Sequence, residues 1–517
     1  MVVYTAITFS PVQGFIEKSR KLRDLYGASL ILSYLSKKIV DGAKDNQCEV
    51  ISPGLPKLAK GMPNRILIKG DFPQELVKET LFNSWKKVLW ECKAWIESHV
   101  SDVVYTWDRD WEMWATHTWE FFWGQGDSIT SAIEDLESNK LSRDWVGINW
   151  IGESSSLTGT DAIAFNRLGS GHRNPKTLNK AQDKQRIDDF YKKLSAVLEN
   201  STEEATEGKV LDLNERLSIP ELVKRLITLP NTGIPQKFPK EDLPFPEKFS
   251  ELSRKPDPQN NITGQWTGWF MGDGDKVGDH LQELLAKPDG EKEIEKFSHA
   301  MRKWGDNLSN NFPRDLGRII YAGGDDFLGV IYSKKKNVDD SQELKKKALQ
   351  WLSNLKEEWQ KHDQDITLSV GFVWVAGSVP QRDVLQHCRE AEKVSKNKGR
   401  NRVTLRIVFN SGQYVEWTVP WDDLGLLSAY EDRDKQENWA HIYNDLAQLK
   451  ARHGISFNPS LKSEKDVSLS KALLDIYFQN KGDYLFTKRE KIVGDKDLNN
   501  FNIWVNNLIE VGWQLCG

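Results

Sequence analysis

The chain has 517 residues, of which 38% are hydrophobic, so at roughly 150 residues per domain it has room for three or four domains with ordinary cores. Its 71 Lys and Arg residues against 75 Asp and Glu give a net charge of −4, which excludes a protein that holds nucleic acid by a uniform positive field. Four scattered cysteines, short apolar runs and the lack of a charged-then-apolar leader predict a cytoplasmic chain without a disulfide framework or a membrane span.

The first 150 residues read as an α/β module. Residues 2–9 predict a strand, and apolar residues at helical spacing from Phe15 to Leu35 predict the helix that follows. Residues 65–69 predict a second strand, before a long Trp-rich helical stretch in which core filling is favoured over stacking on bases. The strand–helix–strand order is typical of a βαβ-type module over residues 1–150.

A basic cluster lies on the first helix and comprises Lys18, Arg20, Lys21 and Arg23. Such a cluster is typical of a solvated helix face, and phosphate-backbone contact is the alternative. Helical periodicity resumes in residues 151–245, most clearly over 217–229. The Pro-rich run 230–258 cannot form a long regular element and therefore predicts a domain boundary.

Residues 246–415 predict a second module. Its elements follow the order β-α-β-β-α-β, which is typical of a ferredoxin-like sheet with helices on one face. Residues 416–517 show mainly helical periodicity and predict a helical C-terminal domain. The second module's expected strands are 267–271, 318–322, 327–332, 366–375 and 402–409, and its expected helices run to 285 and over 294–308, 342–361 and 381–396.

Acidic residues lie at the strand ends of this second module. Asp273 follows the first strand, and Asp325-Asp326 lie at the tip of the hairpin made by the second and third strands. Because those strands pair beside the first, we expect these carboxylates to converge. Carboxylate clusters suit Mg²⁺ or Mn²⁺, and two such ions can support nucleotidyl transfer. Ordinary turn chemistry is the alternative for each Gly-Asp motif alone.

Further candidate residues surround the acidic ones. Glycines at the two motifs would let the backbone approach triphosphate oxygens, and lysines at the end of helix 381–396 could bind the same phosphates or form a solvated helix end. Asp275 is a reserve metal ligand, and Ser369 and Asn401 could hydrogen-bond an adenine or ribose. The glycines are Gly274, Gly278, Gly323 and Gly324, and the lysines are Lys393 and Lys396.

These motifs resemble those of a known family, the large polymerase-like subunit of type III CRISPR effector complexes, particularly the type III-B (Cmr) form. The Gly-Asp-Gly-Asp and Gly-Gly-Asp-Asp sequences are similar to the two palm motifs of that family. Other stretches resemble its first palm, its inter-palm segment and a late part of its second palm. The matching stretches are 272–275, 323–326, 10–16, 20–25, 32–35, 62–65, 214–225, 391–393 and 399–401.

The resemblance implies a fold and a function. The fold is α+β, with two ferredoxin-like palm domains, a helical insert and a helical C-terminal domain. The function is conversion of ATP into cyclic oligoadenylate by metal-assisted 3′-5′ nucleotidyl transfer, with Mg²⁺ or Mn²⁺ held by Asp273, Asp325 and Asp326. The implied partners are guide RNA and target RNA in a multi-subunit ribonucleoprotein, and other type III subunits including a small helical one.

The chain departs from the family in two places. Most members carry an HD nuclease domain before the first palm, whereas this first palm begins at residue 3 and the only His-Asp pair is His362-Asp363. The family's four-cysteine zinc site is not matched, because residues 153–167 contain no cysteine. We therefore expect neither an HD-type DNase activity nor bound zinc.

Two other functions remain as alternatives. One is a non-catalytic RNA-binding scaffold subunit, which would have no need of clustered carboxylates. The other is a stand-alone nucleotide cyclase of the diguanylate type, which shares the palm and its hairpin. The paired palms and the extra helical domain favour the subunit of a complex.

Overall fold

The computed structural model describes residues 2–53, 64–142, 150, 152–166, 180–200, 210–239, 254, 264–333, 341–453, 464–495 and 498–517. The chain forms two compact units. The first unit comprises residues 1–253, 284–306 and 320–324, and the second comprises 254–283, 307–319 and 325–517. The finer domain limits predicted at residues 150, 245 and 415 stay a prediction. Within the described residues, no helix combines the length and the apolar character needed to cross a membrane.

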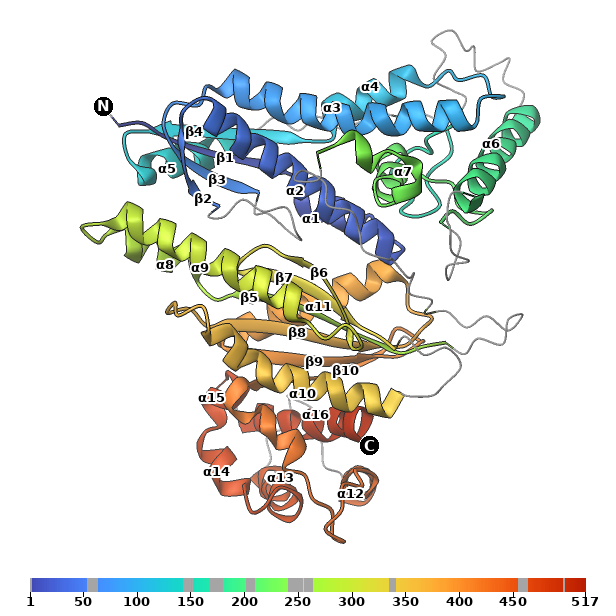
Figure 1. The fold of residues 1–517 in the computed structure, drawn as a ribbon. Coiled ribbons are helices and arrows are strands. Elements are labelled where there is room, and N and C mark those ends of the chain that lie inside the picture. The colour runs from blue at the N-terminus through green and yellow to red at the C-terminus, as the bar shows by residue number, and fades with distance from the viewer. Residues whose placement is uncertain are drawn as a thin grey trace. The chain divides into compact units, whose positions relative to one another are not determined.

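A four-stranded sheet organises the first unit, with the strand order β2-β3-β1-β4. Every pairing in it is antiparallel, and β1 is its central strand, lying between β3 and β4. Strands and helices alternate as β-α-β-β-α-β, so this is a ferredoxin-like sheet and not a parallel βαβ unit (Figure 1). Its elements are β1 (Tyr4–Ser10), α1 (Val12–Glu17), α2 (Leu22–Asp45), β2 (Glu49–Ser52), β3 (Arg65–Lys69), α3 (Gln74–His99), α4 (Asp108–His117), β4 (Glu120–Gly126), α5 (Ile129–Leu141), α6 (Lys180–Asn200) and α7 (Ile219–Leu226).

The interior of the first unit confirms that its tryptophans fill the core. Trp85, Trp107 and Trp111 are at most 2% exposed. Met62-Pro63, at the start of the matching stretch 62–65, lies outside the described residues. The Pro-rich run is described over residues 230–239 and at Arg254, and it forms two short 3-10 helices, η2 (Pro230–Thr232) and η3 (Pro235–Lys237).

A buried ion network joins the start of α2 to α7. The Arg225 guanidinium donates from Nε to Asp24 Oδ1 at 2.7 Å and from Nη1 to Glu215 Oε2 at 2.6 Å. All three side chains are at most 2% exposed. Asp24 Oδ2 also accepts the backbone N–H groups of Arg20 and Lys21 and so caps the start of α2. This network fixes the turn between α1 and α2.

The structure corrects both interpretations of the basic cluster of residues 18–23. Lys18 pairs with Asp161 at 2.8 Å, and Lys21 pairs with Asp212 at 3.2 Å. Arg23 is 4% exposed and donates to the Thr228 carbonyl. Three of the four cations are therefore held within their own unit, because acidic and carbonyl oxygens distant in sequence reach them. The fourth cation, Arg20, lies 3.8 Å from Glu215, and its side chain is 44% exposed.

A six-stranded sheet of order β10-β9-β8-β5-β7-β6 lies within residues 267–420, mainly in the second unit. The four strands β8-β5-β7-β6 repeat the order β4-β1-β3-β2 of the first unit, so the chain contains two ferredoxin-like sheets. Beyond β8, the strand β9 pairs in parallel and β10 pairs with β9 in antiparallel. The elements from 267 to 420 are β5 (Thr267–Gly274), α8 (Val277–Leu285), α9 (Gly290–Asn311), β6 (Gly317–Ala322), β7 (Asp326–Ile331), α10 (Ser341–Gln360), β8 (Leu368–Val375), α11 (Gln381–Asn397), β9 (Arg402–Val408) and β10 (Tyr414–Pro420).

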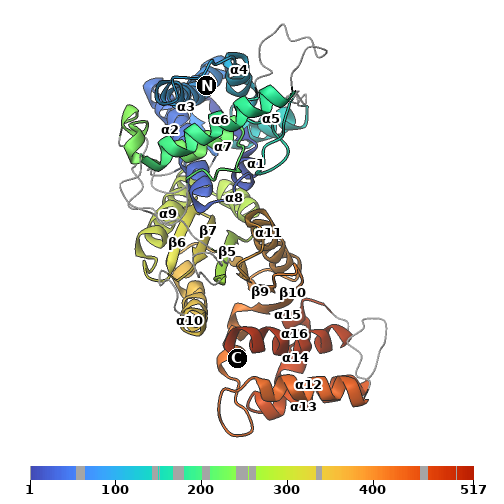
Figure 2. The ribbon, with the colours of Figure 1, turned by 90° about the vertical axis from the view of Figure 1, so that its right-hand side faces the viewer.

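The helices of this sheet do not share one face, contrary to the expectation from sequence. Phe270 of β5 packs on Trp351 of α10, with ring centroids 4.4 Å apart. Gly371 of β8 pairs with Met271, whose side chain lies on the opposite face of the sheet from Phe270. The backbone of α11 lies against this face, because a Cβ added to Gly371 would be 2.4 Å from the Glu392 nitrogen. The sheet therefore lies between α10 and α11 (Figure 2).

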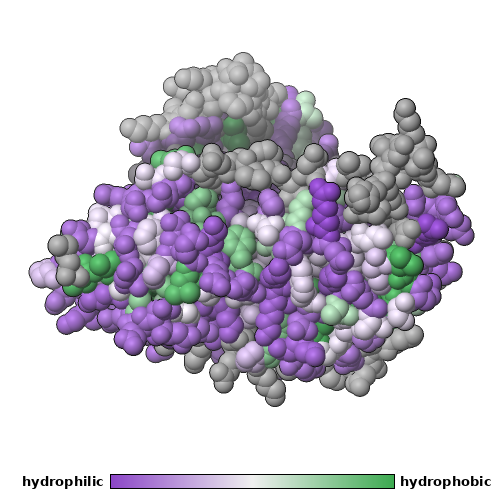
Figure 3. All heavy atoms as spheres, turned by 90° about the horizontal axis from the view of Figure 1, so that it is seen from above, coloured by the Kyte–Doolittle hydropathy of each residue, from purple (hydrophilic) through white to green (hydrophobic). Residues whose placement is uncertain are grey.

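The C-terminal region is helical, as predicted, but the strand β10 before it was not predicted. α16 packs against β10, where Trp504 Nε1 donates to the Thr418 carbonyl at 2.8 Å. One face of the molecule is mainly hydrophilic, with hydrophobic residues in small separate groups (Figure 3), so its described residues offer no broad apolar area. The C-terminal elements are η5 (Trp421–Ser428), α12 (Ala440–His453), α13 (Glu464–Tyr477), α14 (Gly482–Thr487), α15 (Arg489–Val493) and α16 (Leu498–Cys516).

Candidate functional site

The acidic residues of the two motifs meet where β5 and β7 pair. Asp273 and Asp326 are direct partners in the antiparallel register. The backbone N–H of Gly274 donates to the Asp325 carbonyl at 2.9 Å, which holds the hairpin turn against the end of β5. The structure therefore places the three acidic residues that the sequence singled out at the same end of the β5–β7 pair.

The electrostatics of these carboxylates favour a cation. Burial raises the pKa of Asp325 to about 6, and the charge of Asp273 adds to the rise. Burial also raises the pKa of Asp273, although Lys396 opposes that rise. Carboxylates whose ionised forms disfavour one another are stabilised by bound positive charge. Oxygen donors of this kind are the ligands that Mg²⁺ and Mn²⁺ prefer.

A lysine of α11 already supplies one positive charge. Lys396 Nζ contacts Asp273 and lies 2.7 Å from Glu392 Oε1. Burial alone lowers the pKa of Lys396, but its hydrogen bonds to the two carboxylates outweigh burial and raise it. Lys393 is exposed. Glu392 was missed from the sequence, although its i,i+4 spacing from Lys396 is a signal that could have found it.

The predicted glycines differ in what they do. Gly324 has φ +140°, a conformation that favours glycine, and a Cβ at Gly274 would lie 3.0 Å from Val277. No described heavy atom would lie within 4 Å of a Cβ at Gly278, so the space there is open. The Gly323 carbonyl accepts from Arg302 Nη1 at 3.3 Å. Arg302, which sequence reasoning missed, thus helps to hold the turn.

Asp275 and Ser369 are placed differently from the expectation. Asp275 is 4% exposed, and Ser369 is fully buried and donates its hydroxyl to Asp275 at 2.7 Å. The backbone N–H of Asn401 donates to the same carboxylate at 2.9 Å. The Ser369 hydroxyl is therefore committed to Asp275 and is not available to a nucleotide.

The first palm has different residues at the topologically equivalent positions. Thr8 pairs with Arg65 between β1 and β3, as Asp273 pairs with Asp326 between β5 and β7. Asn64, which precedes Arg65 as Asp325 precedes Asp326, donates to Thr8 Oγ1 at 3.1 Å. Hydroxyl, amide and guanidinium groups cannot replace three carboxylates as a divalent-metal site. Of these two matched positions, only the one in the second palm suits metal chemistry.

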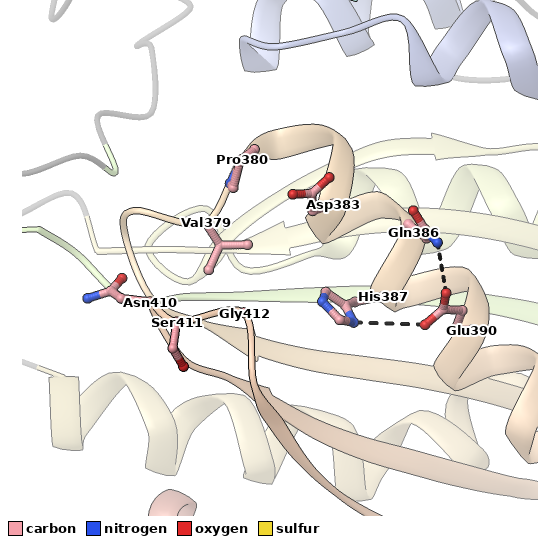
Figure 4. A pocket seen from close by; sticks show the side chains of 9 residues that line it. All are labelled: Val379, Pro380, Asp383, Gln386, His387, Glu390, Asn410, Ser411 and Gly412. Carbon is pink, nitrogen blue, oxygen red and sulfur yellow. Dashed lines mark hydrogen bonds and ion pairs between the residues drawn. The ribbon is translucent and has the colours of Figure 1, made fainter.

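A polar cavity of about 360 Å³ lies elsewhere, between the start of α11 and the turn that joins β9 to β10 (Figure 4). It is at the other end of β8 from the carboxylates, because Asp273 pairs with Ser369 at the start of β8, whereas Val375 pairs with Val408 at its end. Its Glu390 already accepts from Arg406 at 2.8 Å. The cavity is therefore not part of the carboxylate site.

Ligand-type side chains also group in the C-terminal region, at Asp432, Asp434 and His441. The Asp432 carboxylate, however, accepts the backbone N–H groups of Asp434, Gln436 and Asn438 at 2.9, 2.7 and 3.3 Å. Asp432 thus organises its own loop, in the way Asp residues commonly do in turns. The group is explained without a metal.

His362-Asp363 is unsuited to HD-type metal chemistry. His362 is 6% exposed, and its Nδ1 accepts the backbone N–H of Gln364 at 2.9 Å. Burial lowers its pKa to about 4. We predict that the purified chain does not cleave single-stranded DNA when Mn²⁺ is added. Gel analysis of a labelled oligonucleotide checks this, and cleavage that disappears in His362→Ala would contradict it.

Comparison with known proteins gives two family matches and a set of related folds. Residues 267–404 match the Cas10/Cmr2 second palm domain, and residues 4–89 match the N-terminal domain of CRISPR-associated protein Cmr2. No curated protein gives a significant sequence match.

Solved structures with a similar fold include a chain of the apo type III-B Cmr-beta complex, at 12% identity and TM-score 0.53, covering 99% of this chain and 82% of that one. Csm1–Csm4 cassettes with one ATP and with cA4 match at 13% and 14% identity and TM-score 0.41, covering 100% of this chain and 70% of theirs. The first of these three supports the fold. The two matched domains place residues 4–89 and 267–404 in the Cas10/Cmr2 family.

Proposed function

We propose that this chain converts ATP into cyclic oligoadenylate by 3′-5′ nucleotidyl transfer, as the signalling subunit of an RNA-guided type III complex. One observation carries the proposal: Asp273 lies opposite Asp326 in the second palm, and Asp325 is fixed against the end of the same strand. Three acidic residues at one strand end support the binding of the metal ions that assist phosphoryl transfer.

Asp273, Asp325 and Asp326 would hold the Mg²⁺ or Mn²⁺ ions. When bound, such ions activate the attacking 3′-hydroxyl and stabilise the pyrophosphate that leaves. The residues fit this group, because the raised pKa values of Asp273 and Asp325 reflect a need for positive charge and an ammonium group lies against Asp273. When Asp273 binds a metal ion, Lys396 would leave this carboxylate and bind a phosphate oxygen of the nucleotide instead.

The surrounding backbone leaves room for the nucleotide. The open space at Gly278, just after the start of α8, would admit triphosphate oxygens close to the main chain. Gly324 keeps the hairpin turn in a conformation that other residues rarely adopt. These features support triphosphate binding beside the carboxylates.

Guide and target RNA are proposed as partners through the complex and not through this chain alone. The net charge is −4, and the cations Lys18, Lys21 and Arg23 are engaged within the first unit. The isolated chain should therefore bind RNA weakly and with a strong dependence on salt. Other type III subunits, including a small helical one, would supply most of the RNA-binding surface.

The two alternatives are less well supported. A non-catalytic scaffold leaves without a purpose the raised pKa of Asp325, which comes first from burial and then from the charge of Asp273. A stand-alone diguanylate-type cyclase does not account for a second sheet of the same strand order in one chain.

The test is to incubate the purified chain, alone and with the subunits and RNA that co-purify with it, with ATP or GTP and Mn²⁺. We expect oligoadenylate from ATP, with higher yield in the complex bound to target RNA. Product from GTP by the isolated chain would favour the diguanylate-type cyclase, and no nucleotide turnover in any assembly would favour the scaffold.

A further inference from the structure

We propose that Asp275 is a positioning residue and not a metal ligand: its carboxylate holds the end of β5, the start of β8 and the turn between α11 and β9 in the arrangement that the three acidic residues and Lys396 require. The inference rests on the proposed function for its effect on catalysis. Its structural part can be tested separately.

Both oxygens of the Asp275 carboxylate are already engaged. Oδ1 accepts the Ser369 hydroxyl at 2.7 Å, and Oδ2 accepts the Thr367 hydroxyl at 2.7 Å and the Asn401 N–H at 2.9 Å. Asp275 is only 4% exposed. Three of the roughly four acceptor sites of this carboxylate are therefore filled by protein groups, and its burial limits the access of a solvated ion to the site that remains.

The three donors come from segments that carry the site. Ser369 is the direct strand partner of Asp273, so the residue that binds Asp275 also lies beside the acidic residue two positions earlier. The backbone adds to this clamp, because the Asp275 N–H donates to the Thr367 carbonyl at 2.8 Å. Asp275 therefore fixes the spacing of β5 and β8 at the carboxylates.

The third donor fixes the turn after α11. Arg400 and Asn401 have φ of +62° and +49°, a region that costs such residues free energy unless their surroundings hold them there. On one side Asn401 is held by Asp275. On the other side the Arg402 guanidinium donates to the carbonyls of Lys491 and Ile492 at 3.0 and 3.1 Å. Because α11 ends at Asn397, this turn sets where Lys396 meets Asp273.

The consequence is a separation of roles within one motif. Asp273 faces the reacting groups, whereas Asp275 holds Asp273 and Lys396 in the correct position relative to each other. Small displacements of a reacting group can lower a rate by about 10²-fold without removing any binding contact. We therefore expect loss of Asp275 to lower kcat about 10²-fold, with little change in KM for ATP.

The experiment compares four variants of the full chain. Asp275→Ala removes all three bonds, and Thr367→Val and Ser369→Ala remove one each. Asp432→Ala is the matched control, because Asp432 is also 4% exposed and also accepts three hydrogen bonds, but lies outside the site. The number of bound Mn²⁺ ions, kcat and KM for ATP, and amide exchange at residues 399–402 are measured for each.

We expect Asp275→Ala to keep the wild-type number of Mn²⁺ ions, to lose about 10²-fold in kcat, and to exchange faster at residues 399–402. Thr367→Val and Ser369→Ala should show smaller losses in the same direction, and they keep the test valid if Asp275→Ala does not fold. Asp432→Ala should be destabilised, with unchanged kcat and unchanged exchange at 399–402.

Loss of a bound Mn²⁺ ion in Asp275→Ala would identify Asp275 as a ligand and overturn the proposal. Unchanged exchange at 399–402 in all three site variants would overturn it as well. If the wild-type chain makes no oligoadenylate, the proposed function fails, while the ion count and the exchange data still decide the role of Asp275.

Discussion

Replacing Asp325 and Asp326 with alanine should abolish ATP turnover, with a fall of at least about 10³-fold in rate. The double variant leaves Asp273 as the sole remaining carboxylate of the proposed ligand set, so the positive charge that stabilises the transition state can no longer be held there. Steady-state turnover of ATP with Mn²⁺ checks this result. Unchanged oligoadenylate synthesis would contradict the assignment of the site.

The same variant should fold, and without metal it should be more stable than the wild type at pH 7.5. The pKa of Asp325 is raised from 3.8 to about 6, so the folded state binds a proton that the unfolded state has released. The stability of the wild type therefore falls as pH rises from 3.8 to about 6. Above that range the raised pKa of Asp325 lowers the free energy of unfolding by at most about 3 kcal/mol. Added Mn²⁺ should raise the Tm of the wild type but not of the variant.

The matched control changes another adjacent pair of acidic residues. Asp422→Ala/Asp423→Ala makes the same change in net charge in η5, where Asp422 pairs with Lys356. Its ATP turnover should stay within about twofold of the wild type, since substitutions away from a site usually have small effects. A comparable collapse in the control would show that the loss reflects charge or folding and not the site.

Arg225→Ala should unfold or severely destabilise the first unit, by about 3–5 kcal/mol. The substitution leaves Asp24 and Glu215 buried at no more than 2% exposure without their shared cation. It also removes the donor to the Val210 carbonyl at 2.8 Å. Chemical denaturation of the full chain, followed through the buried tryptophans of the first unit, measures the loss.

The effect of pH on this network has a definite sign. Burial alone raises the pKa of Asp24 and of Glu215, but the charge and hydrogen bonds of Arg225 outweigh it, and both pKa values are lowered. Their contribution is present above the unfolded values of 3.8 and 4.5 and is lost as pH falls below them. The wild type should therefore lose stability in acid more steeply than Arg225→Ala.

Arg65→Ala provides the control for this prediction. Its guanidinium pairs with Glu137 at 3.1 Å, but the two side chains are 54% and 46% exposed. A surface pair of this kind contributes about 0–1 kcal/mol. Equal destabilisation by Arg65→Ala and Arg225→Ala would show that burial of the network is not what stabilises the first unit.

The acidic site could be predicted from the sequence because its signals are local. Each carboxylate follows a short apolar strand, and a Gly-Gly-Asp-Asp turn between two such strands indicates a hairpin. Antiparallel pairing of β5 with β7 then places Asp273 opposite Asp326. In contrast, the bonds from Thr367, Ser369 and Asn401 to Asp275 join residues more than 90 positions apart, and neither spacing nor composition encodes them.

Two of the errors in the fold have different causes. The position of α11 depends on the parallel pairing of β8 with β9, because a right-handed crossover fixes the face on which the connecting helix lies. That pairing is not visible in a single sequence. The missed strand β10 did have a signal, since Asn410-Ser411-Gly412 is typical of a turn and is followed by alternating apolar residues.

Mass spectrometry of the products made from ATP by the complex assembled with its own RNA tests the central claim most directly. We expect products whose masses are whole multiples of an adenosine monophosphate residue, with no terminal phosphate, and we expect these products to be absent in Asp325→Ala/Asp326→Ala. The same products from that double variant, or only ADP and AMP from the wild-type complex bound to target RNA, would contradict it.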